Sequence, residues 1–209
     1  MPSPPLLPRL VAVSLLCGAA QLPAHAAPGD PDAAAFARRA VAAGDNQQQP
    51  FAVIDKKNAR LFVYGARGEL KASSPVLLGL ASGDASVPGI GERPMARIEP
   101  HERTTPAGRF VSEPGRNTSG EDIVWVDYDA AISMHRVRAT NKAEWRLQRL
   151  ASPSVADNRI SYGCINVPAA FYDAQVKPAL GTRHGVVYVL PESSPMSSHF
   201  AFLGDDEAR

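Results

Sequence analysis

Cysteine is scarce in this chain of 209 residues, which contains only Cys17 and Cys164. An excess of charge of one sign is also missing, because 22 basic residues balance 21 acidic ones to a net charge of +1. No basic arm carries interleaved aromatic residues, so we predict no nucleic-acid partner. No group of His, Cys or acidic residues has the spacing of a metal centre, and a zinc peptidase is therefore not expected.

A hydrophobic run long enough to cross a membrane is lacking as well. Residues 10–20 form an apolar stretch, but a transmembrane helix needs about 20 apolar residues. Arg9 precedes this stretch, and Ala-His-Ala at 24–26 places small residues where a signal peptidase reads. The pattern predicts a signal peptide over 1–26, export to the periplasm or cell wall, and no stable membrane span after cleavage. An uncleaved anchor is the alternative.

Removal of residues 1–26 leaves Cys164 as the single cysteine. Exported compartments oxidise thiols, so an unpaired thiol there is expected to be buried or used. The simplest alternative is that Cys164 is a small buried hydrophobic residue. A lipid anchor on Cys17 is disfavoured because Leu16, just before it, is too bulky for the usual site.

The rest of the chain is expected to fold as one domain with appendages. A short helix and linker are predicted over 27–50, with Pro31 at the first helical position and Gly44 at the end. Strands are predicted over 51–56, 60–64, 70–78, 109–112, 122–128, 131–135 and 185–190, with helices at 141–150 and 168–178. Residues 192–209 are expected to form a frayed polar tail. The predicted fold class is mainly β: a sandwich or barrel-like core over 51–191 with a few packed short helices.

The densest chemical signal is the segment 159–167, which reads Arg-Ile-Ser-Tyr-Gly-Cys-Ile-Asn-Val. Gly163 permits a tight turn, and a helix is expected to begin near Pro168. Free amides at a helix start favour negative charge and lower a nearby thiol's pKa. Cys164 is therefore a candidate nucleophile.

A nucleophilic thiol needs a base, and His135 ends the predicted strand 131–135. A carbonyl near Ser133 or the hydroxyl of Tyr162 could orient its imidazole. The alternative for His135 is a structural or surface histidine. His184 is the competing base, because a cysteine followed later in the chain by a histidine is the order of papain-like peptidases.

Residues 161–166, Ser-Tyr-Gly-Cys-Ile-Asn, resemble the active-site motif of the L,D-transpeptidase catalytic-domain family. Residues 105–110, Thr-Pro-Ala-Gly-Arg-Phe, are similar to the family's Thr-Pro-x-Gly-x-Phe strand entry, and 59–79 to its first hairpin. Two departures stand out. Tyr162 replaces the family's usual histidine, and the segment between His135 and Cys164 is longer, so that a helix there would lie beside the site.

The resemblance implies that Cys164 attacks a carbonyl of a peptidoglycan stem peptide, with His135 as the base and no cofactor. It implies an oxyanion hole made by the backbone amides of Gly163 and Cys164, and sensitivity to carbapenems, which acylate the same thiolate. Four further residues are expected to contact substrate or brace the loop: Ser161, Tyr162, Asn166 and Arg159.

Six basic residues lie between His135 and Cys164: Arg136, Arg138, Lys142, Arg146, Arg149 and Arg159. They could form a basic wall that attracts substrate carboxylates, or simply a solvated helix face.

Two other functions stay open. The same residues could transfer the acyl group to water, which gives an L,D-carboxypeptidase or an amidase. The chain could also be a wall-binding protein with a degenerate site, for which Tyr162 is the main argument.

Overall fold

The structure is a computed structural model that describes residues 31–206. The predicted signal peptide, with Cys17, lies outside the described residues. Among residues 31–206, no helix is both long and apolar enough to span a membrane.

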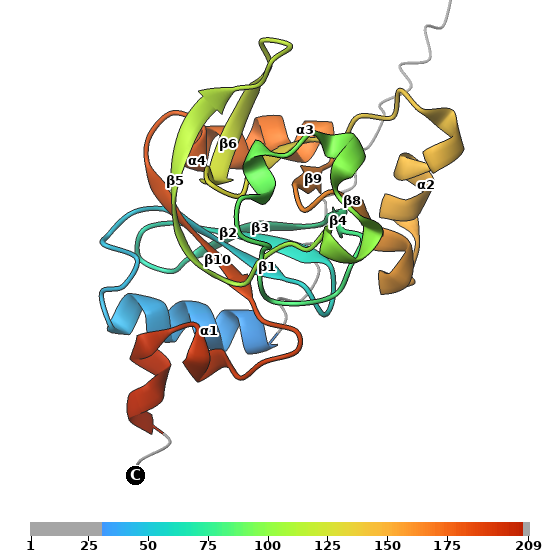
Figure 1. Cartoon of the computed structure of the whole chain (residues 1–209). Coiled ribbons are helices and arrows are strands. Elements are labelled where there is room, and N and C mark those ends of the chain that lie inside the picture. The colour runs from blue at the N-terminus through green and yellow to red at the C-terminus, as the bar shows by residue number, and fades with distance from the viewer. Residues whose placement is uncertain (1–30, 207–209) are drawn as a thin grey trace, which may run out of the picture.

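Eight strands form one sheet, and Figure 1 labels most of them. In chain order they are β1 (Phe51–Asp55), β2 (Arg60–Tyr64), β3 (Leu70–Pro75), β5 (Gly108–Arg116), β6 (Asp122–Asp127), β7 (Ile132–Arg136), β9 (Ile165–Val167) and β10 (Gly185–Leu190). Their order across the sheet is β3-β2-β1-β10-β5-β6-β7-β9. Two short strands, β4 (Leu78–Gly79) and β8 (Arg159–Ser161), pair with each other beside it. The prediction of a mainly β fold with short helices is confirmed.

Strand β5 divides the sheet into two halves. Its residues 108–112 pair with β10, whereas 113–116 pair with β6. The β5–β6 hairpin therefore rises away from the strands around β1, as Figure 1 shows. The predicted strand 109–112 was too short because it missed this second half.

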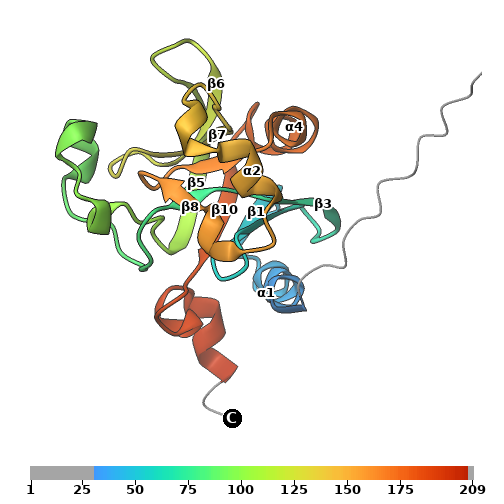
Figure 2. The same cartoon turned by 90° about the vertical axis from the view of Figure 1, so that its right-hand side faces the viewer.

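Both faces of the central strands are covered, so all five residues of β1 are buried. One face packs Phe51 and Val53 against α1 (Pro31–Ala42). The other packs Ala52 and Ile54 against the helical segment 169–180, which comprises α3 (Ala169–Phe171), a π-helical turn (Tyr172–Val176) and α4 (Lys177–Leu180). In Figure 2, α1 and α4 lie on opposite sides of the strands. This arrangement follows from the alternation of side chains along a strand.

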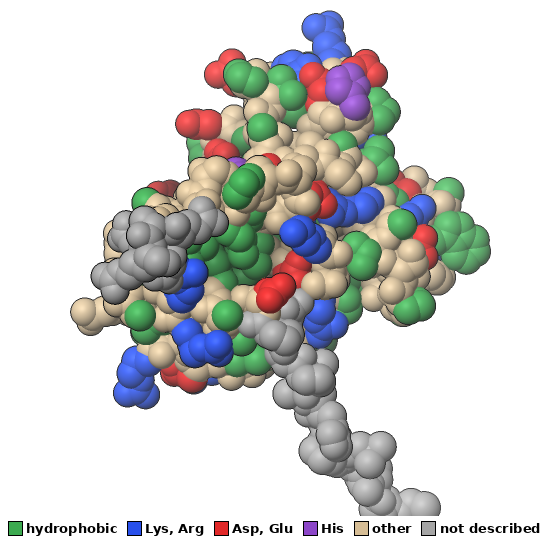
Figure 3. Space-filling view, turned by 90° about the horizontal axis from the view of Figure 1, so that it is seen from below, with side chains coloured by type: hydrophobic (Ala, Val, Ile, Leu, Met, Phe, Trp, Pro, Cys, Tyr) green, Lys and Arg blue, Asp and Glu red, His purple; other side chains and the backbone are tan. Residues whose placement is uncertain are grey.

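The segment after β10 differs from the predicted frayed tail. Phe200 is only 2% exposed and packs with Leu203 against the apolar face of α1, where it meets the ring of Phe36 edge-on. Burial of these apolar side chains stabilises the segment. The described part of the tail is thus a layer of the fold. Figure 3 shows the underside of the molecule, where α1 lies in Figure 1, with basic, acidic and apolar side chains interspersed.

The two predicted internal helices have different outcomes. The helix predicted at 168–178 is confirmed. The helix predicted over 141–150 is broken: a 3₁₀ turn (Lys142–Glu144) precedes α2 (Arg146–Ala151), and Trp145 between them is left-handed, with φ 52°. The Asn141 side chain accepts a hydrogen bond from the amide of Ala143, which caps the 3₁₀ turn rather than one continuous helix.

Candidate active site

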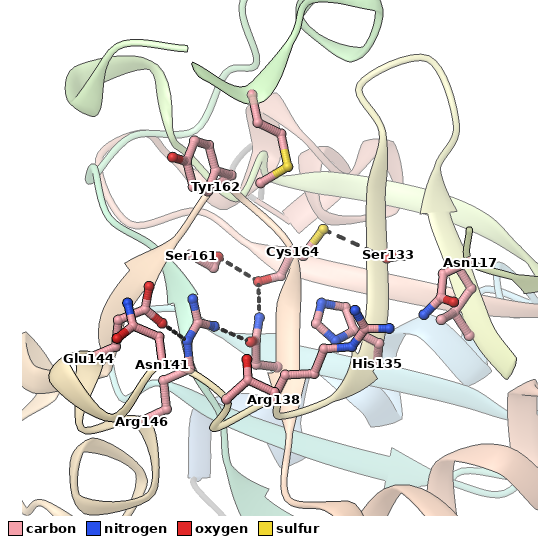
Figure 4. A pocket seen from close by; sticks show the side chains of 14 residues that line it. Asn117, Ser133, His135, Arg138, Asn141, Glu144, Arg146, Ser161, Tyr162 and Cys164 are labelled. Atoms are coloured by element: carbon pink, nitrogen blue, oxygen red, sulfur yellow. Dashed lines mark hydrogen bonds and ion pairs between the residues drawn. The ribbon is translucent and has the colours of Figure 1, made fainter. Parts of the chain in front are cut away.

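Cys164 and His135 line the same pocket, a hollow of about 400 Å³ at the end of the sheet where β7 and β9 pair. The two strands run parallel, with His135 opposite Asn166, so that Cys164, just before β9, lies beside β7. Its Sγ is 3.7 Å from the Ser133 hydroxyl and 3.6 Å from the Ala131 carbonyl oxygen. Figure 4 shows Cys164 and His135 among the side chains that line this pocket.

The environment of Cys164 favours the thiolate. Burial raises the pKa of the thiol, but the hydrogen bond and charge of His135, with further hydrogen bonds from Ser133, outweigh it and bring the pKa below its ordinary value. For His135, burial lowers the pKa, yet the hydrogen bond and charge of Cys164 raise it overall. Each group therefore favours the charged form of the other.

The imidazole is held by its neighbour in the chain. His135 Nδ1 is 2.8 Å from the carbonyl oxygen of Arg136. A carbonyl accepts only, so Nδ1 carries a proton, and Nε2 is the nitrogen left to exchange a proton with Cys164. The orienting group is therefore neither a carbonyl near Ser133 nor the hydroxyl of Tyr162.

The turn that presents Cys164 is closed by Ser161. Its hydroxyl donates to the Cys164 carbonyl at 2.6 Å and accepts the Gly163 amide at 3.1 Å. The Gly163 backbone has φ 125°, and a β-carbon there would stand 2.6 Å from both the Thr104 carbonyl oxygen and the Ile132 side chain. Only glycine fits this position.

The two amides expected to bind an oxyanion differ in availability. The Gly163 amide is committed to Ser161, which corrects the sequence-based expectation for that residue. Within residues 31–206, the amide of Cys164 donates to no other group. It is the amide that remains available to a bound oxygen atom.

Thr105 supports the same turn from β5's side, a role that the sequence motif did not reveal. The buried Thr105 hydroxyl donates to the Gly163 carbonyl at 2.8 Å and accepts the Gly79 amide at 2.9 Å. Its own carbonyl accepts a hydrogen bond at 3.0 Å from Lys56, whose ammonium group is fully buried. A single lysine at the end of a predicted strand gave no sequence signal for burial.

We expect Thr105→Val to loosen this turn. The change keeps the side-chain shape but leaves the Gly79 amide and the Gly163 carbonyl without their partner, which costs about 1–3 kcal/mol in free energy of unfolding. Denaturant titration measures it. Thr104→Val removes a neighbouring hydroxyl that donates to Ala85 and is the matched control. Alkylation of Cys164 should slow in the Thr105 variant alone, and equal rates in both variants would contradict this role.

Asn166 links the cysteine turn to α2. Its side-chain amide donates to the Cys164 carbonyl at 3.1 Å, and its side-chain oxygen accepts from Arg146 at 2.6 Å. Arg146 also pairs with Glu144, and both line the pocket. The segment between His135 and Cys164 thus forms a wall of the pocket, as the sequence predicts (Figure 4).

Tyr162 lies at the junction of two hollows. It lines the Cys164 pocket and a smaller one of about 140 Å³ next to it, and Met95 also borders both. The Arg103 guanidinium stacks on the Tyr162 ring, 3.9 Å from its centre. The ring is thus fixed as part of the wall.

The basic residues of this region are mostly paired, so they do not form a free basic wall. Arg136 pairs with Asp122 and Asp173, and Arg138 with Glu121. Arg159 is not at the pocket: it pairs with Glu192 and donates to the Lys56 carbonyl at 2.9 Å. Arg159 therefore does not line the Cys164 pocket, and its side chain ties Glu192 to the end of β1.

The competing histidine is elsewhere. The His184 side chain is 68% exposed and lies 4.0 Å from Glu113 rather than in the Cys164 pocket. Between residues 31 and 206, no group of three or more His, Cys, Asp or Glu side chains is arranged to hold a metal ion.

No family model matches the chain, and no curated relative matches it. The structure is similar to solved L,D-transpeptidase structures. One from Mycobacterium smegmatis is 16% identical over 68% of this chain and 58% of its own, with a TM-score of 0.38. Another, in complex with imipenem, is 17% identical with the same coverage and a TM-score of 0.40. The helical cell shape determining protein of Campylobacter jejuni is 15% identical over 77% of this chain and 56% of its own, with a TM-score of 0.47.

The chain spans somewhat over half the length of these structures. At such low sequence identities, the activity and ligands of those proteins are not assigned to this chain. The function of this chain rests on its own side chains.

Proposed function

We propose that this chain is an exported cysteine acyltransferase of the L,D-transpeptidase type, which acts on peptidoglycan stem peptides. The observation that carries the proposal is the pairing of Cys164 with His135 in one pocket, with the thiol pKa lowered and the imidazole pKa raised. The motif around Cys164 supplies the substrate class. The pattern of residues 1–26 supplies export to the periplasm or cell wall.

In the first half-reaction, His135 Nε2 takes the thiol proton and the Cys164 sulfur attacks a stem-peptide carbonyl carbon. The carbonyl oxygen becomes an oxyanion, which the free Cys164 amide stabilises; such a donor contributes about 3–4 kcal/mol. The imidazolium returns its proton to the leaving amine as the C–N bond breaks. A thioester on Cys164 remains.

In the second half-reaction, an acceptor amine attacks the thioester. His135 removes the amine proton and delivers it to the departing sulfur, so the thiol is restored and an amide bond is formed. The Arg136 carbonyl keeps Nδ1 protonated throughout, which preserves the imidazole orientation. Carbapenems would enter the first half-reaction only and stay bound as a thioester.

The domain arrangement is part of the proposal. Residues 51–191 would form the catalytic domain. The helix α1 and the segment after β10 form a layer that covers the sheet face on which Phe51 and Val53 lie. The segment between His135 and Cys164, which contains α2, would shape substrate access, because it supplies one wall of the pocket.

Product analysis tests transfer against hydrolysis. The chain from residue 27 onward is incubated with a disaccharide tetrapeptide, and the products are identified by mass spectrometry. We expect crosslinked dimers together with released D-alanine. Trimmed monomers without dimers would instead establish an L,D-carboxypeptidase or amidase. Unchanged substrate, with a Cys164 thiol no more reactive than a free one, would favour the wall-binding alternative.

A further inference from the structure

The segment between His135 and Cys164 presents the aromatic ring of Trp145 to solvent. Trp145 is 61% exposed and Leu147 55% exposed, although both are large apolar side chains. Hydrophobic side chains protrude at the edge of Figure 3 that corresponds to α2 in Figure 1. Trp145 also has a left-handed backbone, with φ 52°, which is uncommon for a bulky residue. A large aromatic side chain is thus exposed where the 3₁₀ turn meets α2.

A further hollow of about 400 Å³ lies on this segment. Trp145 and Leu147 border it together with the polar residues Asn141, Lys142, Arg146 and Gln148. Asn141 and Arg146 also line the Cys164 pocket, so the two hollows adjoin. A ligand seated in one could extend into the other.

The polar groups around Trp145 keep unused hydrogen-bond donors. Asn141 uses its side-chain oxygen for the Ala143 amide, and its NH₂ group makes no hydrogen bond within the described part of the chain. Over the same residues, the ends of the Lys142 and Gln148 side chains make none either. An aromatic face ringed by amide and ammonium donors suits a ligand with apolar faces and hydroxyl or acetamido groups at its edges.

We propose that this hollow is a subsite for the glycan strand of peptidoglycan, a chain of N-acetylated amino sugars. The subsite rests on the proposed function, because a stem peptide seated at Cys164 would bring its sugar to the adjoining surface. The Trp145 ring packs on the C–H face of a pyranose, and the surrounding donors bind its hydroxyl and acetamido oxygens. A protein partner is less suited, because the apolar area is two side chains among charged and amide groups.

Tryptophan fluorescence tests the subsite without turnover. The chain has two tryptophans, so Trp125→Phe leaves Trp145 as the reporter. This variant, without residues 1–26, is titrated with a tetramer of β-1,4-linked N-acetylglucosamine. We expect a saturable change in emission. A flat titration overturns the proposal, as does a change that depends on protein concentration but not on sugar, which would indicate self-association.

Co-sedimentation with peptide-free glycan strands isolates the contribution of the ring. Trp145→Ala should lower the bound fraction at least about tenfold. Tyr128→Ala removes an aromatic ring that is 75% exposed on another loop and should bind as the unaltered chain does. Equal loss in both variants overturns the subsite.

The subsite and the proposed function fail separately. Sugar binding without any acylation of Cys164 by a carbapenem would refute the acyltransferase and leave a glycan-binding surface. Acylation without sugar binding would refute the subsite alone.

Discussion

Cys164→Ala should abolish covalent labelling by a carbapenem and lower acyl transfer at least about 1,000-fold. The reason is that the thioester has no other atom to form on: within residues 31–206, Cys164 is the single free cysteine. Intact-protein mass spectrometry after incubation with the drug shows the adduct directly, as a mass increase equal to one drug molecule in the unaltered chain and none in the variant.

Two controls sharpen this test. Cys17→Ser, in the predicted signal peptide, should leave the adduct unchanged. Ser133→Ala removes the hydroxyl 3.7 Å from the sulfur and should slow labelling without preventing it, because His135 still lowers the thiol pKa. An adduct that persists in Cys164→Ala would show that another group is acylated, and the proposed nucleophile would be wrong.

His135→Ala is expected to raise the pKa of the Cys164 thiol. Burial by itself raises that pKa, and the hydrogen bond and charge of the imidazole reverse the effect, so their removal leaves burial dominant. Less thiolate is then present near neutral pH. Alkylation by iodoacetamide at pH 7 should slow by about 10- to 100-fold. Acyl transfer, which also needs the proton exchange, should fall by about 100- to 10,000-fold.

The direction of the pH dependence follows from the same shifts. In the unaltered chain, alkylation should rise with pH through a midpoint below the ordinary pKa of a thiol. The variant should show that midpoint displaced to higher pH, with the rate recovered in alkaline solution. Acyl transfer in the unaltered chain should decline again above the raised pKa of His135, where the imidazolium loses the proton that the leaving amine needs.

His184→Ala is the matched control, because it removes the histidine that lies by Glu113 and not in the pocket. Its pH profile should match that of the unaltered chain. If His184→Ala abolished activity and His135→Ala did not, the base would be misassigned.

Local patterns predicted several elements well. Strands 60–64 and 185–190 have the predicted bounds, and a helix covers 31–42, within the predicted helix and linker segment 27–50. Other elements were missed. The strand predicted over 70–78 ends at Pro75, because Leu77 then pairs with Asn166, and 78–79 with 159–161, rather than with β2. Trp145 breaks a stretch with good helical composition, since its backbone conformation is set by the surrounding fold.

The sequence by itself determined the candidates for reaction: one thiol after a glycine, an upstream histidine at a strand end, and His184 as the competing base. Short motifs reveal these candidates, because residue type and spacing over a few positions are enough to recognise them. Only the tertiary structure decided which groups meet. The parallel pairing of β7 with β9 brings His135 to Cys164 and leaves His184 outside, and the same packing gives Thr105 and Arg146 their contacts with the turn. Strand pairing between distant segments depends on the burial of whole sheet faces, which no local pattern specifies.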